Sequence, residues 1–198
     1  MDGASRLILA STSRYRRELL ERLRLPFTVM APRVDEIAAP DEAPAALAQR
    51  LALAKAHDVA AREPQATVIG SDQVAELDGR ALGKPGSHDR ATQQLRAMRG
   101  RAVHFHTAVA VVRMSDAFER QALATVTVRF RQFGDDEIER YLRLEQPYDC
   151  AGSAKCETLG IVLAEAIESD DPTALVGLPL IRTSAMLRAA GLDPLGTA

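Results

Sequence analysis

Apolar residues in the first half of the chain come in short runs that are separated by longer amphipathic stretches. Short apolar runs predict buried strands, and apolar positions three or four residues apart predict one face of a helix. Leu19, Leu20 and Leu23 form such a helical stripe, and the small residues before them can cap the helix. The pattern predicts strands at residues 7–10, 27–31 and 67–72, a helix that follows residue 13, and a helix at residues 44–62.

Alternation of apolar and polar positions dominates the second half and predicts two long antiparallel strands, at residues 102–113 and 121–133. Further predicted elements are helices at residues 87–99, 135–144 and 179–190 and a strand at residues 159–166. Strand–helix units mixed with long antiparallel strands indicate a mixed sheet. The predicted fold is therefore α/β, with a mixed sheet and flanking helices in two lobes around a central cleft, and residues 1–198 form a single domain.

A carboxylate stands where the third predicted strand ends, at Asp72. Ligands of open α/β sheets gather where strands end. The dipeptide Asp78-Gly79 predicts a type I′ hairpin turn, which returns the chain and brings Lys84 beside Asp72. An acid and a lysine at such a place suggest phosphate and metal chemistry, whereas an isolated aspartate after a strand is more often a turn or cap residue.

Composition narrows the function classes. The formal net charge is −2, from 25 basic and 27 acidic side chains, so the bulk charge does not attract nucleic acid or an anionic membrane. The longest apolar runs are strand-sized and the N-terminal residues lack the layout of a signal peptide, so we expect a cytoplasmic protein without membrane contact. The spacing of Cys150 and Cys156 fits neither a redox motif nor a zinc pair, and we expect reduced thiols.

The first predicted loop has the residue types of an anion site. Ser11 and Ser13 stand at a helix N-terminus, where free backbone N–H groups and the positive end of the helix dipole favour an anion. Arg16 is one turn into that helix, and its guanidinium can bind two phosphate oxygens at once. An ordinary capped helix with solvated arginines explains this segment alone equally well.

Two acids from separate segments form a candidate metal site. Magnesium takes one or two carboxylates together with substrate phosphates, and Glu36 with Asp72 would meet that need. Lys55 lies in the middle of the predicted helix at residues 44–62, where a lysine is by default solvated. Its role depends on its neighbours in the folded chain.

These separate pieces, taken in order, resemble one family, the Maf nucleoside triphosphate pyrophosphatases. The resemblance covers nearly the whole chain. It is carried by Ser11-x-Ser13-x-x-Arg16-x-x-Leu19-Leu20, Val34-Asp35-Glu36, Leu53-Ala54-Lys55-Ala56, Gly70-Ser71-Asp72-Gln73-Val74, Gly83-Lys84-Pro85 and Val176-Gly177-Leu178-Pro179.

The resemblance implies a fold of the Maf and inosine triphosphatase type and a hydrolase that cuts a nucleotide between its α- and β-phosphates. It also implies a divalent cation (magnesium, manganese or cobalt) and a homodimer. In that chemistry Ser11, Ser13 and Arg16 would hold phosphates. The implied catalytic residues are Lys55 and Lys84, which would neutralise charge, and Glu36 and Asp72, which would hold metal and water, with Asp72 as the general base.

Three residues bear on which base is bound: Tyr15, Gln73 and Glu157. They are similar to the branch of the family that acts on 7-methyl-GTP, although that branch commonly has Pro-Trp where this chain has Arg14-Tyr15. An aromatic face can stack on the cationic 7-methylguanine, and a carboxylate can accept hydrogen bonds from the guanine N1–H and amine.

Two alternatives stay open. The first keeps the enzyme and changes the substrate to UTP, dTTP or a non-standard purine triphosphate. The second is a nucleotide-sensing protein that influences cell division without turnover.

Overall fold

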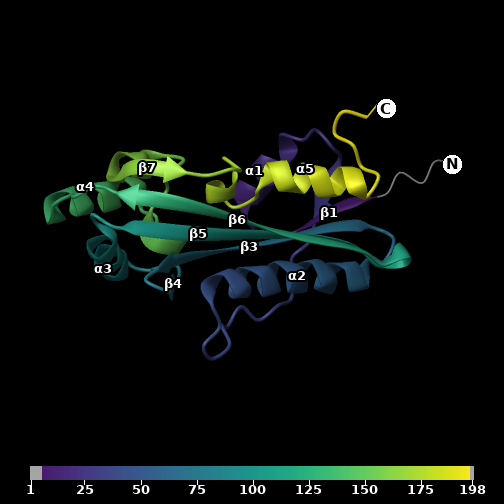
Figure 1. The fold of residues 1–198 in the computed structure, drawn as a ribbon, viewed down its shortest axis with the longest axis horizontal. Helices are drawn as coiled ribbons and strands as arrows, with labels where there is room; N and C mark the ends of the chain where they lie inside the picture. The colour runs from purple at the N-terminus through teal and green to yellow at the C-terminus, as the bar shows by residue number, and fades with distance from the viewer. Residues whose placement is uncertain (1–5, 197–198) are drawn as a thin grey trace.

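The computed structural model describes residues 6–196. Within this range seven strands form one mixed sheet, and five α-helices flank it (Figure 1). The strands are β1 Leu7–Ala10, β2 Phe27–Val29, β3 Thr67–Leu77, β4 Arg80–Leu82, β5 Ala102–Arg113, β6 Phe118–Phe130 and β7 Ala164–Glu168. The helices are α1 Arg14–Glu21, α2 Pro44–Arg62, α3 His88–Met98, α4 Asp135–Glu145 and α5 Leu180–Ala189. The predicted mixed α/β fold is confirmed.

The sheet has the order β2-β1-β3-β5-β6-β7, with β4 paired to the far end of β3. β1 is parallel to β2 and β3, and all the other pairs are antiparallel. β5 and β6 are long strands that run through the whole molecule and join its two ends (Figure 1). The two predicted lobes therefore share one sheet and are not separate units.

A gap in strand pairing along one edge of β3 positions the site. β1 pairs with β3 only as far as Ala10 and Gly70, and β4 begins to pair with β3 at Ala75. Residues 71–74 thus have β5 on one side and, in the part of the chain that the structure describes, no strand on the other. The prediction that this strand ends at Asp72 is wrong, because pairing with β5 keeps β3 extended. The strand that ends at this level is β1.

Side chains along β3 and β5 point alternately to the two faces of the sheet, and different helices cover these two faces. α2 covers one face, where its buried stripe packs on Ile8, Val68 and Ala110. α1 and α5 cover the other face at one end of the sheet, and α3 and α4 gather at the opposite end (Figure 1). No helix in residues 6–196 is long and apolar enough to cross a membrane.

Most element boundaries agree with the predictions, and the hairpin turn is confirmed, since Asp78 and Gly79 have φ values of 51° and 76°. The strand predicted at residues 159–166 is wrong in its first half. There Leu159–Leu163 is a 3₁₀ turn, η3, and β7 begins only at Ala164. Gly160 explains the difference, because a Cβ at this position would lie 2.5 Å from the carbonyl oxygen of Lys155, so the chain wraps closely around that residue.

β6 also differs from its prediction, since it spans Phe118–Phe130 and not residues 121–133. It begins earlier because the connection from β5 is a short 3₁₀ turn, η1 Met114–Asp116, that closes at Ala117 with φ of 54°. It ends earlier because pairing with β7 becomes irregular between Arg129 and Phe130. β2 ends at Val29, before the predicted residue 31.

Gly70 is the point of closest approach between β3 and α2. A Cβ there would lie 2.2 Å from the carbonyl oxygen of Ala52 and 2.6 Å from the amide nitrogen of Ala56, both on the α2 backbone. Contacts this short with backbone cannot be relieved by a rotamer change, so a side chain at residue 70 must push α2 away from the sheet.

We expect Gly70→Ala to lower the free energy of unfolding by about 1–3 kcal/mol, because it overpacks the interface with α2. Urea unfolding followed by circular dichroism measures the change. Gly83→Ala is the matched control, since a Cβ at residue 83 meets no atom within 4 Å. Equal stability of the two variants would show that α2 tolerates the displacement.

Candidate active site

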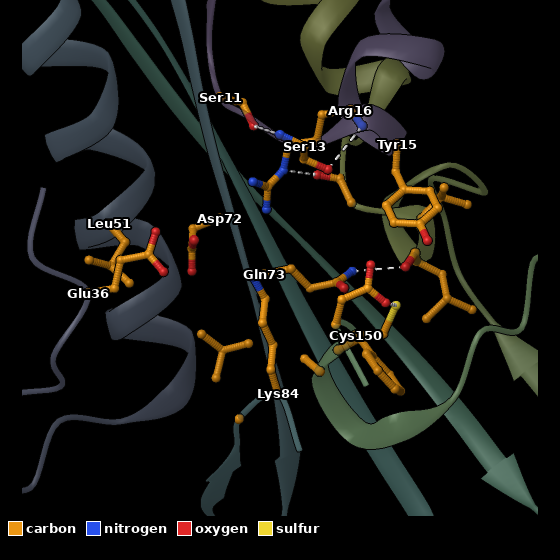
Figure 2. Close-up of a pocket in the computed structure, with 18 of the residues that line it drawn as sticks. Ser11, Ser13, Tyr15, Arg16, Glu36, Leu51, Asp72, Gln73, Lys84 and Cys150 are labelled. Atoms are coloured by element: carbon orange, nitrogen blue, oxygen red, sulfur yellow. Dashed lines mark hydrogen bonds between the residues drawn. The ribbon is translucent and has the colours of Figure 1, made fainter. Parts of the chain in front are cut away.

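A cleft of about 650 Å³ opens at the gap beside β3, and this volume suits a nucleotide (Figure 2). The gap explains why side chains from both faces of β3 reach it. All ten candidate residues that the sequence singled out line the cleft: Ser11, Ser13, Tyr15, Arg16, Glu36, Lys55, Asp72, Gln73, Lys84 and Glu157. The fold therefore brings together segments that are far apart in the sequence.

Lys55 joins the two candidate acids. Its ammonium nitrogen lies 2.6 Å from Oδ1 of Asp72 and 2.5 Å from Oε1 of Glu36. The side chains of Lys55 and Asp72 are only 7% and 10% exposed, whereas that of Glu36 is 57% exposed. Lys55 comes from the buried face of α2 and is thus no solvated lysine. The three charges form an acidic centre at one wall of the cleft, with Glu36 and Asp72 facing each other (Figure 2).

The charge state of Glu36 follows from its basic neighbours. Burial alone would raise the pKa of Glu36, but the hydrogen bond and charge of Lys55, followed by the charges of Lys84 and Arg16, outweigh burial and hold the pKa below its usual value. Glu36 is therefore ionised at neutral pH, and its negative charge is partly neutralised by the cleft itself.

The acidic centre fits a divalent cation that is shared with a substrate. Within residues 6–196 no group of three or more His, Cys, Asp or Glu side chains converges as a metal cage. Magnesium, however, needs only one or two carboxylates when phosphates and water complete its shell. Oε2 of Glu36 and Oδ2 of Asp72 accept no hydrogen bond within residues 6–196, so each acid has an oxygen to offer.

The rim above Asp72 carries hydroxyl groups at the start of α1 (Figure 2). Ser13 caps this helix, since its Oγ accepts from the amide of Arg16 at 3.4 Å, and Ser11 Oγ accepts from the amide of Ser13 at 3.1 Å. Both hydroxyls are used as acceptors by the backbone, so their hydrogens remain to donate to an anion. The predicted helix cap is confirmed, and the same residues face the cleft.

Arg16 is fixed through its Nε, which donates to the carbonyl oxygen of Gly177 at 2.9 Å. Burial lowers the pKa of Arg16, and the charges of Asp72 and Glu36 act in the opposite direction. The guanidinium stays charged, because its ordinary pKa is so high. With Nε occupied, its terminal nitrogens remain for a ligand between the rim and the acidic centre.

Lys84 follows β4 and points back into the cleft from the side opposite Ser11 and Ser13 (Figure 2). The predicted hairpin therefore does return Lys84 to Asp72. No hydrogen bond or ion pair of Lys84 occurs within the described residues, although its charge reaches Glu36. A bound anion between Lys84 and Arg16 would meet positive charge from two sides.

The end of the cleft away from the acidic centre holds Tyr15. Its ring lies beside two cations, with Cζ of Arg14 4.7 Å and Nζ of Lys155 5.9 Å from the ring centroid. Arg14 also donates to the Tyr15 hydroxyl at 2.8 Å. Because Lys155 is buried and Arg14 is exposed, Arg14 is the group that an incoming aromatic ring can displace.

Glu157 and Cys150 also line the cleft, and the charge of Lys155, which lies beside the Tyr15 ring, acts on both. The Glu157 side chain is accessible to water, yet the surrounding walls displace much of its hydration, and this burial raises its pKa above the usual value. Burial likewise raises the pKa of the Cys150 and Cys156 thiols to about 12. Both cysteines are free thiols, as predicted, and neither is a nucleophile at neutral pH.

Sequence reasoning missed Thr107, one of the residues that hold the inner wall of the cleft, which is a short 3₁₀ turn, η4 Ala174–Val176. Ser71 Oγ lies 3.0 Å from the carbonyl oxygen of Gly177, and Thr107 Oγ1 donates to the carbonyl oxygen of Ala174 at 2.8 Å. Gln73 bonds to the same turn. Thr107 lies beside Gln73 because the two residues are paired across β3 and β5. This register is not visible in the sequence, so no sequence signal pointed to Thr107.

Comparison with known proteins identifies the family of this chain. A model of the Maf-like protein family matches residues 6–190. The 7-methyl-GTP pyrophosphatase of Polaromonas sp. is 64% identical over 94% of this chain and 85% of that protein. Those of Albidiferax ferrireducens and Bordetella pertussis are 63% and 59% identical, each over 96% of this chain and over 96% and 94% of their own length. The chain therefore belongs to the Maf family.

Proposed function

We propose that this protein hydrolyses 7-methyl-GTP to 7-methyl-GMP and pyrophosphate. The observation that carries the proposal is the arrangement of the cleft, in which Lys55 joins Glu36 and Asp72 at one wall and Tyr15 and Glu157 stand at the other end. One end suits a triphosphate and the other an aromatic base. The names of the relatives that match nearly the full chain support the same substrate.

In the proposed reaction Asp72 accepts a proton from the attacking water molecule. The water oxygen bonds to phosphorus, and the bond from phosphorus to the bridging oxygen between the α- and β-phosphates breaks. Pyrophosphate leaves with that bridging oxygen or receives the water oxygen, according to which phosphorus is attacked. Arg16 and Lys84 hold the phosphate oxygens and stabilise the charge that develops on them.

Glu36 and Asp72 would hold a divalent cation, for which we propose magnesium, manganese or cobalt. Such an ion would polarise the phosphate oxygens and offset their negative charge. Lys55 positions both acids, and Ser11 and Ser13 donate their hydroxyl hydrogens to phosphate oxygens. The residues of the cleft thus bind, orient and neutralise the substrate before any bond breaks.

Base choice rests on Tyr15, Gln73 and Glu157. The ring of Tyr15 can stack on the cationic 7-methylguanine, with a cation–π contribution of about 0.5–2 kcal/mol. Arg14 must move from the ring to let the base stack on the face that it covers, which reduces this gain. Glu157 supplies the negative charge that complements the base and can accept from its N1–H and amine.

The cellular location and the assembly are further proposals. The family resemblance and the charge pattern support a cytoplasmic homodimer that acts on free nucleotides and does not bind nucleic acid.

A substrate panel tests the central proposal. We expect kcat/KM for 7-methyl-GTP to exceed that for GTP, UTP, dTTP and ITP, since only the first combines a positive charge with guanine's donors. Activity is measured as pyrophosphate release with magnesium, manganese or cobalt, and EDTA should abolish it. A preference for UTP or dTTP by more than about tenfold would make this a pyrimidine pyrophosphatase.

We expect Asp72→Asn to lower kcat by about 10²–10⁴-fold, because an amide cannot accept the proton of the attacking water. Lys55 then loses one of its two anionic partners and keeps Glu36. Circular dichroism and nucleotide binding separate lost chemistry from lost folding. If Asp72→Asn keeps a cell-division effect of the wild type, the nucleotide-sensing alternative gains over the enzyme.

The raised pKa of Glu157 predicts how substrate affinity depends on pH. Glu157 must be ionised to accept hydrogen bonds, and its raised pKa means that it takes up a proton nearer neutrality than an ordinary glutamate does. KM for 7-methyl-GTP should therefore rise as the pH falls from neutrality toward the ordinary pKa of glutamate, while kcat changes less. Glu157→Gln should flatten this KM profile, and a profile identical to that of the wild type would remove Glu157 from base binding.

A further inference from the structure

The side-chain amide of Gln73 is held between β5 and the turn η4. Its Nε2 lies 2.9 Å from Oγ1 of Thr107 and 3.0 Å from the carbonyl oxygens of both Ala174 and Leu175. Gln73 lines the cleft between the acidic centre and the Tyr15 end (Figure 2). Three acceptors thus surround one nitrogen.

These partners determine which way round the amide lies. Backbone carbonyl oxygens can only accept hydrogen bonds, so the nitrogen of the amide must face Ala174 and Leu175. Oε1 of Gln73 makes no hydrogen bond within residues 6–196, while every buried side-chain nitrogen or oxygen atom described there has a partner. Oε1 is therefore not fully buried, and Gln73 lines the cleft, so Oε1 is open to a ligand there.

Thr107 further restricts the orientation of the Gln73 side-chain amide. It is fully buried, and its hydroxyl donates its one hydrogen to the carbonyl oxygen of Ala174 at 2.8 Å. Toward Gln73 the hydroxyl can then act only as an acceptor. A flipped amide would place its oxygen against three acceptors and leave a buried oxygen without a donor, which is costly.

We propose that Thr107 is a positioning residue for substrate choice, because it fixes the Gln73 amide with only an acceptor turned to the cleft. Gln73 then reads an N–H group of the base. Together with the Glu157 carboxylate, it offers two acceptors to a base with neighbouring donors, as guanine has in its N1–H and exocyclic amine. Uracil, thymine and hypoxanthine have a single ring N–H and cannot satisfy both. This inference rests on the proposed nucleotide function and deepens it.

The test compares 7-methyl-GTP with 7-methyl-ITP, which differ only in the exocyclic amine. The ratio of kcat/KM and the ratio of Kd without metal, from calorimetry, are measured for the wild type, Thr107→Val and Thr107→Ser. We expect the wild type to prefer the amine and Thr107→Val to lower both ratios about 5- to 20-fold, through KM and not kcat. Thr107→Ser keeps the hydroxyl and should restore the preference.

Thr183→Val is the matched control. Thr183 is also fully buried, and its hydroxyl donates to the carbonyl oxygen of Pro179 at 2.7 Å, but it has no bond to Gln73. This variant loses the same kind of hydrogen bond and should leave both ratios unchanged. It therefore measures what the loss of a buried hydroxyl does to the protein in general.

Three outcomes would overturn the inference. The first is a wild-type protein that binds both nucleotides equally. The second is that Thr107→Val weakens the binding of both nucleotides to the same degree, which is the result expected of a purely structural role. The third is Thr183→Val that lowers the ratios as much as Thr107→Val. Failure of the proposed hydrolysis is a separate result, because the Kd ratio still measures reading of the amine in a protein that binds without cutting.

Discussion

The site depends on residues 71–74 of β3, which within the described part of the chain have a neighbouring strand on one side only. Within a fully paired sheet, side chains of successive residues point to opposite faces and cannot share a pocket. Because β1 stops at Ala10 and β4 starts opposite Ala75, the edge at residues 71–74 is open, and Asp72 and Gln73 both reach the same cleft. α2 supplies Lys55 from one face, and η4 closes the site from the other.

Charge balance inside the cleft differs from that of the whole molecule. The chain carries a formal net charge of −2, yet within residues 6–196 the end of the cleft at the acidic centre is lined by three basic side chains, Arg16, Lys55 and Lys84, and by two acids. The excess positive charge is therefore local, as an anion site in an acidic protein requires. Lys55 and Asp72 are both buried, so removal of Lys55 would leave Asp72 as a buried charge without its ion-pair partner and would destabilise the fold.

The sequence alone predicted the elements well where the pattern was long and periodic, as in α2 and β5, whose bounds agree with the predictions. It failed where tertiary contact decides conformation. The turn η3 wraps around Lys155 because Gly160 permits close approach, and no local pattern reveals that contact. The apolar run before Asp72 suggested that the strand ends there, whereas the pairing partner that determines its length lies more than thirty residues away in β5.

For the candidate site, the sequence predicted residues that line the cleft and missed Thr107, which orients one of them. Asp72, Lys55 and Arg16 belong to motifs with a recognisable order along the chain. Thr107 belongs to none, and its importance comes from its register opposite Gln73 and from the carbonyl oxygens of η4. Contacts of this kind depend on the fold as a whole and leave no local signal.

The position of η4 along the chain has a consequence for biosynthesis. The segment at residues 174–177 accepts hydrogen bonds from Arg16, Ser71, Gln73 and Thr107. The residue before it, Thr173, accepts through its Oγ1 from the amide of Leu180 at the start of α5. Residues 174–177 are synthesised after all the other residues that line the cleft. A growing chain on the ribosome therefore lacks this inner wall even when the rest of the cleft has been made. The ribosome must therefore deliver nearly all of the described chain before the cleft acquires its final shape, and partly made chains lack the complete nucleotide site.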